Sequence, residues 1–67
     1  MNIDIRKSIH DSFLETDIKE IRISIEDALA TKEELALPGL GVFFEILWNN
    51  CTQEEKDQIL YKIKNGI

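Results

Sequence analysis

The chain has 67 residues and carries 13 acidic against 8 basic side chains, giving a net charge of −5. A chain of this length forms one domain, residues 1–67, and buries only about 60% of its unfolded surface, so its core is small. A disulfide framework is excluded because Cys51 is the only cysteine. Cys51 and His10 are too few soft ligands for a metal site, so we predict neither metal nor cofactor. Helix packing or self-association must then supply the missing stability.

The acidic charge disfavours nucleic-acid binding, because neutralisation of phosphates by Lys and Arg supplies most non-specific affinity. Nucleic-acid binding is kept as an alternative because four basic residues would form a patch if the two ends of the chain met: Arg6, Lys7, Lys62 and Lys64. The longest uncharged run, from Leu35 to Phe44, is far shorter than the roughly 20 residues that span a bilayer, so we expect no membrane segment.

Charged residues near the start interrupt any apolar run of the kind that a secretory signal needs, so we expect none. A single unpaired cysteine fits a reducing compartment. Together these features predict a cytoplasmic-type location.

Apolar residues at every fourth position predict a first helix from about Ile3 to Leu14. Asn2 is its expected N-cap, and His10 lies at the edge of the apolar stripe. After a break at residues 15–17, Asp17 and Glu20 have the spacing of a capping box and predict the start of a second helix. The two stripes consist of Ile5, Ile9 and Phe13 in the first helix and Ile18, Ile21, Ile25 and Leu29 in the second.

Thr31 and Glu34 repeat the capping spacing and predict a short helical turn from Lys32 to Ala36. Leu37 precedes a proline, which disfavours the α conformation, so this turn should end there. Pro38 suits the first turn of the following helix, where its missing N–H costs nothing.

The segment from Leu40 to about Asn50 is apolar at nearly every position, which predicts a helix buried on several sides. Glu45 is its single charge and should mark the strip that faces solvent. Just before and within this segment, Gly39 and Gly41 would permit a positive φ or the close approach of another backbone.

A last helix is predicted from the third capping pair, Thr52 and Glu55, to a C-cap at residues 65–66. Its apolar face consists of Ile59, Leu60 and Ile63. The segments together predict an all-α fold, a compact bundle of about four short helices with a central apolar helix.

Three patterns in the sequence could suggest chemistry, and none favours catalysis. The Gly39-x-Gly41 pair has neither the preceding strand nor the lysine of a phosphate loop. Neighbouring carboxylates fall at helix ends or on polar faces rather than in a cleft that would separate their pKa values. Nothing in the sequence shows that Cys51 and His10 meet as a nucleophile and its base. We therefore predict that the protein is not an enzyme.

The aromatic residues of the central helix favour packing over ligand binding, since a stacking platform for single strands also needs a positive groove. Phe43 and Phe44 are adjacent and point about 100° apart, so both cannot face one small core from the same side. We therefore expect a homodimer through the Leu40–Trp48 helix, and no other protein partner is indicated. The candidate self-association residues are Leu40, Phe43, Phe44, Leu47 and Trp48.

The segment Leu37-Pro38-Gly39-Leu40-Gly41-Val42-Phe43-Phe44-Glu45-Ile46-Leu47-Trp48 resembles the LPGLGVLFE-[VI]-[IL]-W signature of the small acid-soluble spore protein I family of spore-forming Firmicutes. The N-terminus, the Glu-rich stretch before Leu37 and the last amphipathic helix resemble that family too. Two features depart from it: Cys51, and the absence of the lysine-rich tail of some members.

The resemblance implies a short protein made in the forespore and retained in the spore core, with a non-enzymatic structural or protein-interaction role in sporulation. It implies no catalytic or ligand-binding residues. The glycine-containing DNA-binding motifs of the α/β-type acid-soluble spore proteins are absent from this sequence.

Overall fold

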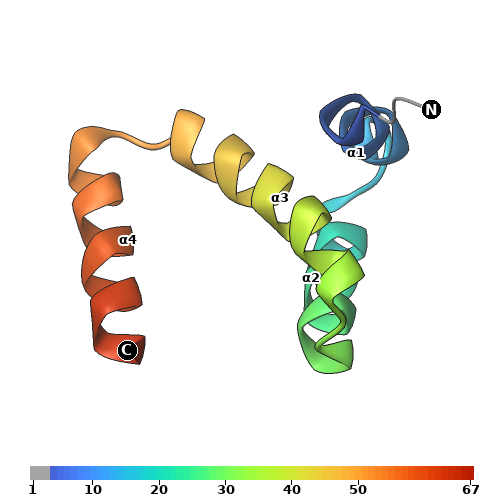
Figure 1. The fold of residues 1–67 in the computed structure, drawn as a ribbon. Coiled ribbons are helices and arrows are strands. Elements are labelled where there is room, and N and C mark those ends of the chain that lie inside the picture. The colour runs from blue at the N-terminus through green and yellow to red at the C-terminus, as the bar shows by residue number, and fades with distance from the viewer. Residues whose placement is uncertain (1–3) are drawn as a thin grey trace.

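The computed structural model describes residues 4–67 (Figure 1). Within that range the chain forms four α-helices and one 3₁₀ turn, and no strand, which confirms the prediction of an all-α fold. The elements are α1 (Ile5–Phe13), α2 (Ile18–Thr31), η1 (Glu34–Ala36), α3 (Leu37–Asn49) and α4 (Gln53–Gly66).

The apolar helix α3 is central, as predicted. α1 and α2 pack against it, and α4 extends away from its C-terminal end (Figure 1). In the view of Figure 1, α2 and α4 extend to the same side of α3 and leave its middle uncovered. The radius of gyration is 13.2 Å, compared with about 11 Å for a close-packed domain of this length. The difference arises because α4 leads away from the other helices rather than folding back over them.

Side-chain caps fix the starts of three helices. Asp17 accepts a hydrogen bond from the Glu20 N–H and caps α2, as predicted. Thr52 and Glu55 form the predicted capping box at α4, with both reciprocal hydrogen bonds present. In α1 the cap is Asp4, which accepts from the Lys7 N–H at 3.0 Å. The predicted cap Asn2, like the predicted first helical residue, lies outside the described residues.

The prediction that Thr31 caps a new helix is wrong. Thr31 is the last residue of α2, and its hydroxyl donates to the Ala28 carbonyl. Lys32 ends α2 in the left-handed conformation with φ of 53°, where glycine is the usual residue. The short turn that follows is 3₁₀ and begins at Glu34. The Thr31 hydroxyl bonds back to a carbonyl of α2, so it does not cap the following turn as its spacing suggested.

The short turn ends at Ala36, as predicted, but the expectation that Leu37 avoids the α conformation is wrong. Leu37 has helical angles, φ of −60° and ψ of −43°, and begins α3 directly after the 3₁₀ turn. Pro38 stands in the first turn of α3, as predicted. The α conformation before a proline is disfavoured rather than forbidden, and η1 leads Leu37 directly into α3.

Neither Gly39 nor Gly41 uses its freedom of φ, since no described glycine has a positive φ. A Cβ at Gly39 would lie 3.6 Å from Cδ1 of Ile9, so α1 crosses α3 closely at that point. Residues 65–66 do not form the predicted C-cap: Gly66 is the last residue of α4 and Ile67 follows as the cap.

The prediction that α3 is buried on several sides does not hold within one chain. Among residues 4–67 only Val42 is buried, with 6% of its surface exposed. Phe44, Ile46 and Leu47 are 43%, 44% and 48% exposed. The physical reason is that α1 and α2 cover one side of α3 while α4 turns away, so one side of an apolar helix stays open.

The capping box of α4 gives a testable prediction. Thr52→Ala should destabilise α4 by about 1 kcal/mol, because the Glu55 N–H loses its acceptor. The reverse hydrogen bond, from the Thr52 N–H to the Glu55 carboxylate at 2.8 Å, lowers the pKa of Glu55. A lowered pKa in the folded state contributes stability above the unfolded pKa of about 4, and this contribution is lost as the pH falls through the folded value.

Circular dichroism between pH 7 and pH 2 measures both effects. Helix content should fall at acid pH, and Glu55→Gln should flatten that response. Glu54→Gln is the matched control, since Glu54 is the adjacent acid in the same turn and takes no part in the capping box. An unchanged acid response in Glu55→Gln would contradict the prediction.

Candidate functional site

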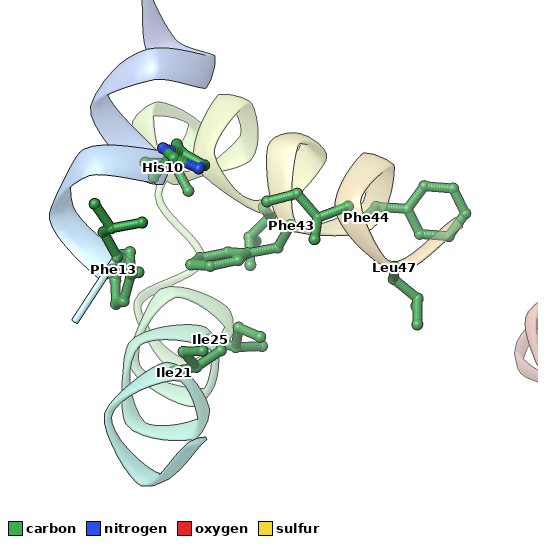
Figure 2. A pocket seen from close by; sticks show the side chains of 11 residues that line it. His10, Phe13, Ile21, Ile25, Phe43, Phe44 and Leu47 are labelled. Atoms are coloured by element: carbon green, nitrogen blue, oxygen red, sulfur yellow. The ribbon is translucent and has the colours of Figure 1, made fainter. Parts of the chain in front are cut away.

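An apolar groove of about 620 Å³ lies between α1, α2 and α3 (Figure 2). Its lining side chains are aliphatic or aromatic apart from one histidine. They are Ile9, His10 and Phe13 from α1, Leu14 at its C-cap, Ile21 and Ile25 from α2, and Leu40, Phe43, Phe44, Ile46 and Leu47 from α3. The volume is in the range of sites that bind small molecules or anchor side chains of a partner.

Helical spacing explains how α1 and α2 supply the walls. Ile9 and Phe13 are four residues apart on α1, and Ile21 and Ile25 are four apart on α2, so each pair projects from one face of its helix. The ring of Phe43 enters from α3 and meets the ring of Phe13 edge-on, with centroids 5.2 Å apart and an interplanar angle of 69°. Edge-to-face contact is a favoured geometry for aromatic pairs. Phe43 therefore joins all three helices.

Phe44 points elsewhere, as the 100° rotation between adjacent helical residues requires. Its ring stacks on Trp48 of the same helix, with centroids 5.8 Å apart and planes 28° from parallel. Figure 2 shows Phe43 directed toward Phe13 and Ile25, while Phe44 lies at the far end of the groove. Phe43 thus packs in its own chain, and Phe44 stays 43% exposed.

Four of the five candidate self-association residues line the groove: Leu40, Phe43, Phe44 and Leu47. Trp48 lies beside the start of α4 instead, where the Lys56 ammonium is 5.3 Å from the centre of its ring. The groove walls from α1 and α2 were predicted only as helix faces turned toward a core. Apolar residues at positions i and i+4 identify an apolar face on each helix. They do not show that two such faces leave a groove between them.

The four basic residues weighed for nucleic-acid contact do not come together. Arg6 pairs with Glu45 at 3.1 Å and Lys7 with Asp11 at 2.8 Å, and the Lys7 hydrogen bond holds the pKa of Asp11 below its usual value. Glu45 is exposed, as expected of the solvent-facing strip, but it faces α1 through this pair. The other two candidates, Lys62 and Lys64, belong to α4, which lies at the opposite end of α3 from α1 (Figure 1).

His10 and Cys51 are also separated. His10 is on α1, with its Nδ1 atom 3.6 Å from the Asp11 carboxylate. Cys51 is half-buried at the junction between α3 and α4, where its N–H donates to the Trp48 carbonyl. The structure does not place the imidazole beside the thiol.

Residues 4–67 lack the features of a metal site and of a membrane span. In that part of the chain, no group of three or more His, Cys, Asp or Glu side chains is arranged to hold a metal ion. None of the helices described there has the length and apolar character needed to cross a membrane.

The described residues define a small all-α protein with an open apolar groove. The model of the family described as "Small, acid-soluble spore protein I" matches residues 3–67, so the chain belongs to that family and the resemblance of its central segment is confirmed. Membership associates the protein with the spore.

Proteins of that name from several bacteria are similar to this chain over its whole length. The one from Halalkalibacterium halodurans is 39% identical over 67 residues, covering 100% of this chain and 98% of that protein. Those from Shouchella clausii and Bacillus subtilis are 33% and 30% identical over 100% of this chain, covering 97% and 94% of those proteins. No solved structure matches the chain.

Proposed function

We propose that this protein acts without catalysis in the spore core, as a structural or protein-interaction protein that forms a homodimer through α3. The proposal joins the family membership, which gives the spore context, to the uncovered apolar side of α3. It assigns the exposed parts of Phe44 and Leu47 to contact between copies.

The total exposed surface is the observation that carries the proposal. The chain exposes 6108 Å², whereas a compact monomer of 7.8 kDa exposes about 4,400 Å². The excess is about 1,700 Å² per chain, or about 3,400 Å² for two chains. Homodimer interfaces that form permanently bury roughly 2,000–5,000 Å² in total. The excess area therefore matches what a stable dimer needs.

The kind of surface supports the same proposal. The exposed side chains Phe44, Ile46 and Leu47 of α3 line the groove together with apolar residues of α1 and α2. Large contiguous apolar surfaces are rare on monomeric proteins and mark interaction sites. Burial by a second copy would also supply the stability that a 67-residue core lacks.

Sedimentation velocity at micromolar concentration tests the dimer. We expect a species of twice 7.8 kDa that dissociates on dilution. A clean species of 7.8 kDa at all concentrations would rule the dimer out.

Binding to duplex DNA, measured at ~50 mM salt and above, tests the nucleic-acid alternative. Binding that weakens steeply with added salt would favour that alternative instead.

A further inference from the structure

The C-terminal helix α4 has an apolar face that its own chain leaves largely open. Ile59, Ile63 and Ile67 follow one another at intervals of four residues. Within the chain, α4 meets α3 near its start, where Lys56 lies over Trp48 and Leu60 adjoins Phe44 and Trp48. Beyond that point Ile63 is 45% exposed and Ile67 is 93% exposed. The capping box fixes the start of α4. The helix therefore presents an ordered apolar face that its own chain leaves exposed at Ile63 and Ile67.

The groove offers what that face lacks. None of its lining residues comes from α4. The chain's own α4 does not fill it, because α4 starts at the C-terminal end of α3 and leads away (Figure 1). Binding of an amphipathic helix in an apolar groove uses anchors at intervals of three and four residues. Leu60, Ile63 and Ile67 have that spacing.

Charge favours α4 over other segments as the occupant. The stretch from Glu15 to Glu34, which contains the α2 wall of the groove, has seven acidic and three basic residues, a net charge of −4. The segment from Gln58 to Ile67, which comprises the later part of α4 and its C-cap, has two lysines and no acid, a net charge of +2. At 100° per residue, Lys62 and Lys64 fall on either side of the apolar face. A partner's α4 would therefore bring cations toward α2 and the acidic segments on either side of it, while its apolar face meets the apolar lining.

We propose that α4 of one copy lies in the groove of a second copy, and that the second copy returns its own α4 in the same way. This inference rests on the proposed homodimer. A two-fold axis makes the two contacts identical, since each chain supplies one groove and one helix. The exchange covers the open side of α3 and the open face of α4 together, which accounts for the excess surface of both.

Aspartate substitution on the two faces of α4 tests the exchange. Ile63→Asp places a charge on the apolar face, and Tyr61→Asp places the same charge at a position 72% exposed on the outer face of the same helix. In sedimentation equilibrium, Ile63→Asp should raise the dimer dissociation constant at least about 100-fold, because a symmetric dimer would bury two unpaired charges. Tyr61→Asp should leave it within about threefold.

Cysteine cross-linking provides a second measurement that needs no destabilising change. In a Cys51→Ser background, a copy with Leu14→Cys at the rim of the groove is mixed with a copy with Ile63→Cys and mildly oxidised. The mixed disulfide, identified by mass, should form in good yield, whereas Tyr61→Cys in place of Ile63→Cys should give little. Equal yields from the two α4 positions would overturn the exchange.

The outcomes separate this inference from the proposed function. A wild-type chain that stays monomeric overturns the homodimer and the exchange with it. A wild-type dimer that persists in Ile63→Asp keeps the homodimer through α3 and overturns the exchange. If Ile63→Asp loses its helix content by circular dichroism, the cross-linking yields decide.

Discussion

Phe43→Ala is expected to destabilise the fold by about 3 kcal/mol, the low end of the range for buried phenylalanines, because Phe43 is only half-buried. The substitution removes the ring that meets Phe13 edge-on and lines the groove beside Ile21 and Ile25. A domain of this length has about 3–10 kcal/mol of stability in total. The loss should therefore detach α1 and α2 from α3 in a large fraction of molecules.

Urea unfolding followed by circular dichroism, at one fixed protein concentration, measures the change. Phe44→Ala is the matched control, since it removes the same side chain one position along α3, where the ring contacts Trp48 and is 43% exposed. At a protein concentration low enough to keep both variants monomeric, Phe44→Ala should lower the urea midpoint clearly less than Phe43→Ala does. Equal losses would contradict the assignment of Phe43 as the residue that joins the three helices.

Leu47→Gln is expected to weaken self-association by about 100-fold or more. Leu47 lines the groove and is 48% exposed in the single chain, so the isolated fold should tolerate glutamine there. In a symmetric dimer the interface would lose the apolar burial of two leucine side chains. It would also remove two glutamine amides from water, which costs free energy. Because both copies carry the substitution, the loss in the free energy of dimerisation is counted twice. The effect on the folding of the monomer stays small.

Dilution series in analytical ultracentrifugation measure the dissociation constants. Asn49→Gln places the same side chain two residues further on α3 at an exposed polar position, and it should behave like the wild type. If Leu47→Gln and wild type dissociate at the same concentration, the open side of α3 does not form the interface.

Local sequence signals predicted the helices well because they act over three or four residues. Asp17 and Thr52 cap helices as their spacing predicts, and the apolar stripe of α2 falls on one helical face. Apart from the C-cap predicted at residues 65–66, the errors in local structure occur between Thr31 and Gly41, where two short-range rules competed at Thr31 and at Leu37. Thr31 bonded back into α2, and Leu37 entered α3 despite the proline after it. Such choices depend on free energy differences of about 1 kcal/mol, which tertiary packing easily reverses.

The candidate site was predicted in part. The sequence identified α3 as the helix with more apolar surface than one small chain can cover, and four of its five candidate residues line the groove. It did not identify the α1 and α2 walls, because which helix faces meet depends on the angles at which the connecting segments direct the helices. Ile46 was missed for the same reason.

The sequence alone determined that adjacent Phe43 and Phe44 diverge by about 100° and so cannot share a face. It also determined the membership of the spore protein family, which the segment from Leu37 to Trp48 indicated and the match over residues 3–67 confirmed. Only the tertiary structure decided that Phe43 turns toward α1 and α2 while Phe44 stays exposed. The direction of Phe43 depends on where α1 and α2 pack, and the exposure of Phe44 on the direction in which α4 leaves α3 after Cys51, because connecting segments rather than local sequence set these directions.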